Sequence, residues 1–164
     1  MNAAVAGTSY HLPDINQVRD LMGMLFDGLA VKPGAKLDLT AKSSAYFAIY
    51  VTDSGAPAAL CACDIAFAAN SGAALSMLPP NAAKDAAKTQ QLTDVMIANL
   101  REVMNICTRL VLRENTPHLR LETICTASKL PAAAAAIVGA AKGRIDFEIG
   151  LGKYAGGLFA VLVA

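Results

Sequence analysis

Residues 92–112 constrain the fold more than any other part of this sequence, because they predict a long amphipathic helix. Apolar residues recur there at the spacing of helix turns, and most polar residues fall on the opposite side. The predicted apolar stripe consists of Leu92, Val95, Met96, Val103, Ile106, Cys107 and Leu110. The opposite side of the helix consists of Ala98, Arg101, Glu102, Asn105 and Arg109. Such a helix has to bury its apolar face against another layer, so we expect a sheet beside it.

Three further helices are predicted from caps and periodicity. The first begins at Asp14, a good N-cap, and ends near Gly28, before a turn over residues 32–34. The second follows Asp64 as its cap and covers about residues 65–78. The third covers residues 128–141, with a proline in its first turn. Residues 81–91 are polar and alanine-rich, and we expect a linker or a loose helical turn there.

Six short segments have the composition of strands: residues 37–42, 45–51, 58–63, 119–125, 144–149 and 158–163. Turn signals at residues 53–55 and 153–157 predict two hairpins. Strands that follow one another or pair as hairpins favour an antiparallel or mixed sheet. The predicted fold class is therefore α+β, with two long helices packed on one face of the sheet.

Length and composition predict one domain over residues 14–164, preceded by a flexible tail over residues 1–13. With 55% apolar and 16% charged residues, the chain is not of the disordered class. A net charge of +1 without a basic run argues against nucleic-acid binding. The N-terminus lacks a signal-peptide pattern and no apolar run is long enough to cross a bilayer, so we expect a cytoplasmic protein without membrane contact.

The four cysteines are Cys61, Cys63, Cys107 and Cys125. The spacing of Cys61 and Cys63 inside an apolar run does not match a zinc motif, and the chain has only two histidines. We expect buried, reduced thiols that pack as small apolar side chains, and no metal site.

The residues with most chemical potential are Glu102 and Asn105, which are three positions apart and therefore share one helix face. A carboxylate there can pair with a lysine or orient a cation, and an amide can hold a water in line with a leaving group. The same spacing also fits an ordinary solvated helix face. Both interpretations stay open on spacing alone.

Residues 92–112, LTDVMIANLREVMNICTRLVL, resemble the signature helix of the CheC/CheX family of chemotaxis phosphatases. In active members that helix carries Asp or Ser, then Glu four positions later and Asn three positions after that. Glu102 and Asn105 match this pattern, whereas Ala98 departs from it at the Asp/Ser position. The order of elements over about residues 14–163 is also similar.

CheC-type members carry a second copy of the motif on their first helix. The equivalent register here is Asn16, Asp20 and Gly23, and Gly23 has no amide side chain. The first copy is therefore expected to be inactive, as in the single-motif arrangement of CheX-like members.

The resemblance implies hydrolysis of the phospho-aspartate of a CheY-type response regulator. Glu102 would engage a lysine of the regulator and Asn105 would position the attacking water. The regulator would supply Mg2+, and this chain would need no cofactor of its own. The resemblance also favours a homodimer. Two alternatives remain: a catalytically inactive interaction module, like the flagellar switch proteins, and a small-ligand domain with a pocket under the hairpins.

Overall fold

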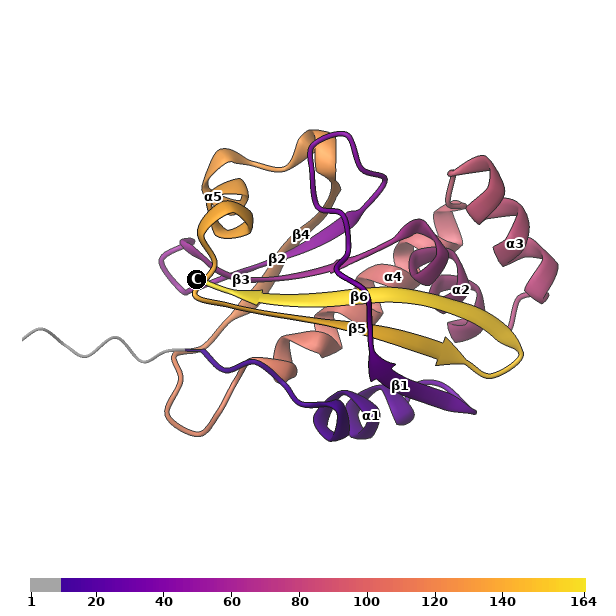
Figure 1. The fold of residues 1–164 in the computed structure, drawn as a ribbon, viewed down its shortest axis with the longest axis horizontal. Helices are drawn as coiled ribbons and strands as arrows, with labels where there is room; N and C mark the ends of the chain where they lie inside the picture. The colour runs from indigo at the N-terminus through magenta and orange to yellow at the C-terminus, as the bar shows by residue number, and fades with distance from the viewer. Residues whose placement is uncertain (1–9) are drawn as a thin grey trace, which may run out of the picture.

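The computed structural model describes residues 10–164, which form a six-stranded antiparallel sheet in the order β1-β5-β6-β3-β2-β4 (Figure 1). Every neighbouring pair of strands is antiparallel. The strands are β1 Leu29–Pro33, β2 Tyr46–Val51, β3 Pro57–Cys63, β4 Arg120–Thr126, β5 Gly143–Leu151 and β6 Tyr154–Val163. The predicted α+β class with an antiparallel sheet is confirmed.

Helices cover both faces of this sheet (Figure 1). They are α1 Ile15–Gly23, α2 Ile65–Leu75, α3 Pro80–Thr89, α4 Asp94–Cys107 and α5 Ala132–Ala140, with short 3-10 helices at Thr108–Leu110 and Ala127–Lys129. The longer helices α2 and α4 pack together in the core on one face, which α1 and α3 also join. Within residues 10–164, α5 is the α-helix that contributes to the core on the other face, together with Ala127 of the second 3-10 helix. The prediction of two long helices on one face is confirmed, and the helix predicted over residues 128–141 is present as the shorter α5 on the other face.

The central strands are buried on both faces, which explains their nearly continuous apolar sequences. In β2, Ala48 and Tyr50 face the core under α2 and α4, whereas Phe47 and Ile49 face the core under α5. The same alternation continues through β3 and β6. The apolar side chains of this single sheet therefore contribute to two core layers, one on each face.

Small side chains let α2 and α4 approach closely. A Cβ on Gly72 of α2 would lie 2.8 Å from the Met96 carbonyl oxygen of α4, so no larger residue fits there. Phe67 of α2 packs against Phe159 of β6, with ring centroids 5.3 Å apart. The alanine-rich composition thus produces a closely packed core of small side chains.

The first strand lies elsewhere than predicted. Residues 37–42 carry no strand, and β1 at Leu29–Pro33 pairs with β5 instead. Apolar and polar residues alternate around Leu37 because Leu37 is buried under α5, in an irregular segment that is not a strand. Its amide donates to Asp146 Oδ2 at 2.9 Å and its carbonyl accepts from Arg144 at 2.6 Å. The prediction failed because burial without a strand ladder gives the same apolar alternation.

The first helix is also shorter than predicted. α1 ends at Gly23, not near Gly28, and Gly28 instead adopts a φ of 68° in the turn that leads into β1. Pro33, predicted to lie in a turn, is the last residue of an edge strand, where a missing amide donor is tolerated.

Two further assignments need correction. Most of residues 81–91, predicted as a linker or loose turn, belong to the regular helix α3, whose Ala83 and Ala86 are buried. The turn predicted over residues 153–157 is shorter: β5 ends at Leu151 and β6 starts at Tyr154. Gly156 and Gly157 therefore belong to β6, where a Cβ on Gly157 would collide with Asp64 and Phe67 at the start of α2.

The predicted tail and the described residues overlap at residues 10–13. Tyr10 donates from its hydroxyl to the Pro117 carbonyl at 3.3 Å, and the His11 amide donates to the Val111 carbonyl at 3.1 Å. Pro13 is buried. The chain thus contacts the domain from Tyr10 onward, and the rest of the predicted tail, residues 1–9, lies outside the described residues.

We expect Met77→Gly to raise the free energy of unfolding by about 1 kcal/mol. Met77 follows α2 with a φ of 56°, and the amides of Met77 and Leu78 donate back to Ala74 and Ala73. Glycine is preferred in this left-handed position, and the Met77 side chain is 82% exposed, so little packing is lost. Urea denaturation measures the change, and a loss of stability would contradict this account of the turn.

Candidate functional site on helix α4

Helix α4 is a fixed platform. Thr93 caps its first turn by accepting a hydrogen bond from the Met96 amide at 3.3 Å. One face is buried, through Met96, Leu100, Val103, Met104 and Cys107. Asn99 joins α4 to α2 by donating to the Gly72 carbonyl at 2.8 Å and to Ser76 Oγ at 2.7 Å. A side chain on the outer face of α4 therefore has a well-defined position.

Glu102 and Asn105 both lie on the exposed face of α4. Their i,i+3 spacing places their Cβ atoms about 5–6 Å apart on consecutive turns. None of the ion pairs among residues 10–164 includes Glu102. Ala98, also exposed, precedes Glu102 by one turn. The structure thus brings the two predicted residues together on one accessible surface.

The helix ends just beyond Asn105, which defines one border of the candidate site. Thr108 Oγ1 donates to the Asn105 carbonyl at 2.7 Å, and the chain then tightens into the 3-10 turn. This hydrogen bond uses the Asn105 backbone, so the side-chain amide remains available. The sequence predicted a helix reaching residue 112, and the regular α-helix stops at Cys107 instead.

Charged and apolar side chains border the pair. Arg101 and Arg109 are exposed, as the predicted polar side requires. Val95 was predicted in the buried stripe, and that placement is wrong, since Val95 is 49% exposed. Ile97, at 43% exposure, adds a second apolar contact surface near the start of α4. The outer face of α4 therefore combines hydrogen-bonding groups with apolar contact area.

Helix α1 lies beside the end of α4, next to Thr108–Leu110. Arg113 connects α1 to this turn by donating to Gln17 Oε1 at 3.0 Å and to the Leu110 carbonyl at 3.2 Å. A shallow cavity of about 310 Å³ lies between them, and its wall includes Asp20, Met24 and Arg109. A partner that contacts Asn105 would also meet this part of α1.

The first-helix copy of the motif sits on the solvent face of α1. Asn16, Asp20 and Gly23 are all exposed, and Asn16 Oδ1 accepts a hydrogen bond from Arg19 at 2.9 Å. Gly23 is the last residue of α1 and offers no side-chain donor. The three positions share a surface without reproducing a carboxylate–amide pair.

Three of the four cysteines are buried in the core between the sheet and α4: Cys61, Cys63 and Cys107. Burial raises the pKa of the Cys61 thiol to about 12, and it also raises the pKa values of Cys63 and Cys107. Cys125 on β4 is only half-buried. Within residues 10–164, no cluster of three or more His, Cys, Asp or Glu side chains has a metal-binding arrangement.

Thiol labelling of the native protein should therefore modify Cys125 and spare the other three cysteines. At about pH 8 the raised pKa values and burial leave almost no accessible thiolate in the core. Ellman's reagent should titrate one thiol in the native protein and all four after denaturation. Cys125→Ser should remove the native reaction, and rapid labelling that survives this change would contradict the assignment.

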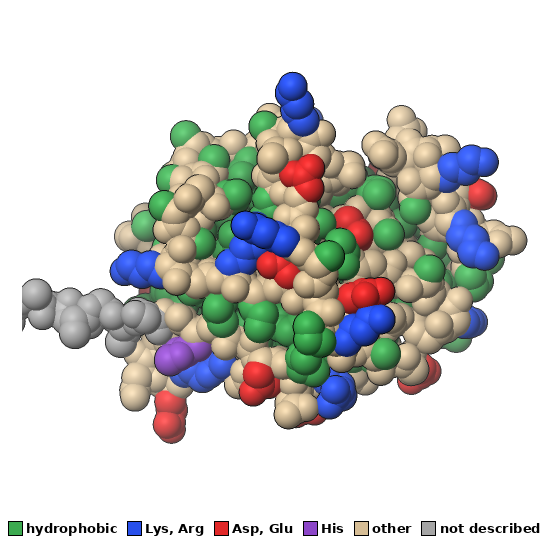
Figure 2. Space-filling view, in the orientation of Figure 1, with side chains coloured by type: hydrophobic (Ala, Val, Ile, Leu, Met, Phe, Trp, Pro, Cys, Tyr) green, Lys and Arg blue, Asp and Glu red, His purple; other side chains and the backbone are tan. Residues whose placement is uncertain are grey.

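Within residues 10–164, neither His118 nor the surface charges form a second candidate site. His118 Nδ1 lies 3.1 Å from Asp53 Oδ1, and both side chains are largely exposed, so this is a surface pair. Charges of both signs are scattered over the face shown in Figure 2, without a single basic patch. Within the described chain, none of the helices combines the length and apolarity needed to span a bilayer.

No family model and no curated protein matches this sequence. A chain in the crystal structure of the CheX-CheY-BeF3-Mg+2 complex from Borrelia burgdorferi is similar with a TM-score of 0.48 and 15% identity, over 91% of this chain and 90% of that chain. A likeness of this degree leaves the functional case to the residues of α4.

Proposed function

We propose that this chain dephosphorylates a CheY-type response regulator through Glu102 and Asn105. The observation that carries the proposal is the position of these two side chains. Both are exposed on consecutive turns of α4, and the opposite face of that helix is fixed in the core. The match of both residues to the CheC/CheX signature helix supports the same function.

The proposed reaction transfers the phosphoryl group of an aspartyl phosphate to water. The Asn105 amide would hold a water opposite the bond between phosphorus and the aspartate oxygen. The water oxygen would bond to phosphorus as the bond between phosphorus and the aspartate oxygen breaks. The electron pair of that bond would stay on the regulator's aspartate as a carboxylate, and inorganic phosphate would leave with the protons of the water. Catalysis of this kind depends on positioning and charge stabilisation, which a fixed helix face can supply.

Glu102 would act as the docking and orienting residue. Its carboxylate can pair with a lysine of the regulator and so fix Asn105 over the phosphoryl group. The Mg2+ ion would belong to the regulator. The homodimer and the cytoplasmic location remain predictions that the sequence makes.

Ala98 favours one alternative, a catalytically inactive interaction module. Its methyl group cannot accept or donate the hydrogen bond that Asp or Ser would make at this position. Val95 and Ile97 are exposed near Ala98 and offer apolar area for docking. On this alternative the surface of α4 would bind a regulator, or another signalling protein, without accelerating hydrolysis.

Substoichiometric amounts of this protein distinguish the two functions. An enzyme should release phosphate from many equivalents of a phosphorylated CheY-type regulator in the presence of Mg2+. A module should bind the beryllofluoride-activated regulator without changing the rate of phosphate release. If neither binding nor turnover occurs with several regulators, the phosphatase and the regulator-binding module are both wrong, and a module for another signalling protein is left.

A further inference from the structure

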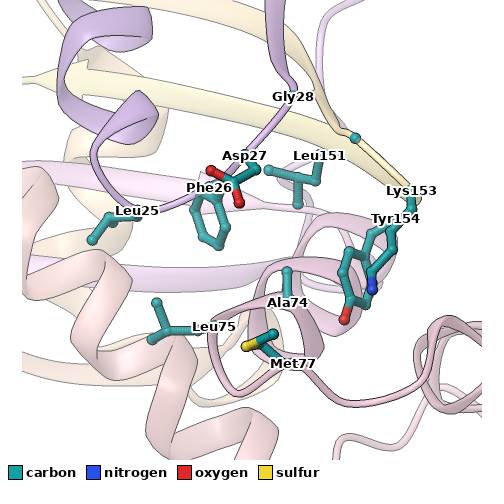
Figure 3. Close-up of a pocket in the computed structure, with 11 residues that line it drawn as sticks. Leu25, Phe26, Asp27, Gly28, Ala74, Leu75, Met77, Leu151, Lys153 and Tyr154 are labelled. Carbon is teal, nitrogen blue, oxygen red and sulfur yellow. The ribbon is translucent and has the colours of Figure 1, made fainter.

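A cavity of about 580 Å³ opens at the end of the molecule formed by the β5–β6 turn (Figure 3). Three segments that are distant in sequence line it: residues 25–28 after α1, residues 74–77 at the end of α2, and residues 151–154 of the turn. None of the lining residues belongs to α4. The volume is within the range of small-molecule sites in proteins, roughly 300–1,000 Å³.

The floor of this cavity is apolar. Phe26, Leu151 and Tyr154 are buried, and Leu25 and Leu75 are half-buried. The Tyr154 hydroxyl donates to the Leu78 carbonyl, so its polar end is satisfied by the protein. The Tyr154 ring therefore acts as an apolar wall, and the floor suits a branched aliphatic or aromatic side chain.

Two opposite charges lie above this floor on separate segments. Asp27 comes from the loop after α1 and Lys153 from the β5–β6 turn (Figure 3). Both side chains are exposed, and none of the ion pairs among residues 10–164 includes either of them. Lys153 Nζ lies 5.7 Å from the centroid of the Tyr154 ring. The cavity thus offers a carboxylate and an ammonium group that form no ion pair with each other.

We propose that this cavity binds a free α-amino acid with a large apolar side chain, of the leucine, methionine or phenylalanine class. The ligand carboxylate would pair with Lys153 and its ammonium group with Asp27, while its side chain would contact Phe26, Leu151 and Tyr154. A simple carboxylic acid or amine would satisfy only one of the two charges. Zwitterionic character together with an apolar body is therefore the chemistry that this site selects.

Met77 is placed to cover such a ligand. It lines the cavity, its side chain is 82% exposed, and its backbone adopts the left-handed conformation that favours glycine. The long, flexible thioether side chain can fold over an apolar ligand. Met77→Gly, which should stabilise the free protein, is accordingly expected to weaken ligand binding. A gain in stability accompanied by a loss of function is typical of residues that serve a site.

Calorimetric titration with L-leucine and three analogues tests the proposal. Leucinamide lacks the carboxylate, 4-methylpentanoate lacks the ammonium group, and glycine lacks the side chain. L-leucine, L-methionine or L-phenylalanine should bind, and the analogue of leucine missing any one feature should bind at least about tenfold more weakly, since each loses a charged or apolar contact.

Matched variants locate the binding. Lys153→Gln and Asp27→Asn should each weaken binding at least about tenfold. Lys84→Gln and Asp85→Asn make the same chemical changes on the exposed face of α3, outside the cavity, and should leave the affinity unchanged. Circular dichroism confirms that each variant is folded.

Several results would overturn the proposal. These are no heat of binding for any apolar amino acid at millimolar concentration, equal binding of leucine and 4-methylpentanoate, or unchanged affinity in both cavity variants. A peptide whose only charged group is its terminal carboxylate, if it bound more tightly than leucine, would replace the amino acid as the occupant and would also overturn it. Activity of the α4 surface does not affect these outcomes, because the cavity shares no residue with α4.

Discussion

Replacing Asn105 by alanine should lower the acceleration of phosphate loss from a CheY-type regulator by at least about 100-fold. The amide that holds the attacking water is then absent, while docking through Glu102 is retained. The effect should appear in the turnover rate at saturating regulator, with little change in the regulator concentration that gives half-maximal rate. A time course of phosphate release at several regulator concentrations separates the two parameters.

The fold should tolerate this change. Asn105 is exposed, and alanine is the better helix former, so the free energy of unfolding should change by no more than about 0.5 kcal/mol. Asn16→Ala is the matched control, because it removes an exposed helical amide from the first copy of the motif on α1. It should leave the rate unchanged. Full activity in Asn105→Ala would show that Asn105 does not position the water.

The second large effect concerns stability. Gly157→Ala should lower the free energy of unfolding by about 2 kcal/mol, within the usual range for an overpacked core. A Cβ at this position would collide with the Asp64 side chain and with the Phe67 backbone. Asp64 caps α2 by accepting from the Phe67 amide at 2.8 Å, so the collision falls on the start of that helix. Urea denaturation followed by circular dichroism measures the loss.

Gly139→Ala provides the comparison for this change. Gly139 lies in α5, and a Cβ there would meet no atom within 4 Å. Alanine in a helix interior is favoured over glycine by about 0.5–1 kcal/mol, so this variant should be slightly more stable than the parent. Equal effects at Gly157 and Gly139 would mean that the packing of β6 against α2 is looser than the structure shows.

Elements with a strong local pattern could be predicted from the sequence. Asp14 and Asp64 are recognisable caps, and the apolar positions of α4 and of β2 recur with helical and strand-like patterns. The boundaries and the edge strand could not be predicted as well. β1 is short and ends in a proline, so its local pattern is weak. The alternation of apolar and polar residues around Leu37 looks like a strand, but it arises because Leu37 is buried under α5. An alternating pattern therefore indicates which side chains are buried, but a buried segment need not form the hydrogen bonds of a strand.

The candidate sites show the same limit. Helical spacing predicts that Glu102 and Asn105 share a face, because i and i+3 are local neighbours. The local sequence does not predict that Asn99 fixes α4 to α2, since its hydrogen-bond partners, Gly72 and Ser76, are distant in the sequence. The cavity with Asp27 and Lys153 is assembled from three distant segments. Only the folded sheet brings these segments together, so the sequence alone gives no sign of it.

The most direct test of the central proposal is the rate at which acyl phosphate is lost from a phosphorylated CheY-type regulator in the presence of Mg2+. The measurement uses saturating amounts of this protein and a parallel sample without it. The proposal predicts faster decay that scales with bound protein and returns to the spontaneous rate in Asn105→Ala. Decay at the spontaneous rate, with the regulator demonstrably bound to α4, would contradict a phosphatase and leave an interaction module.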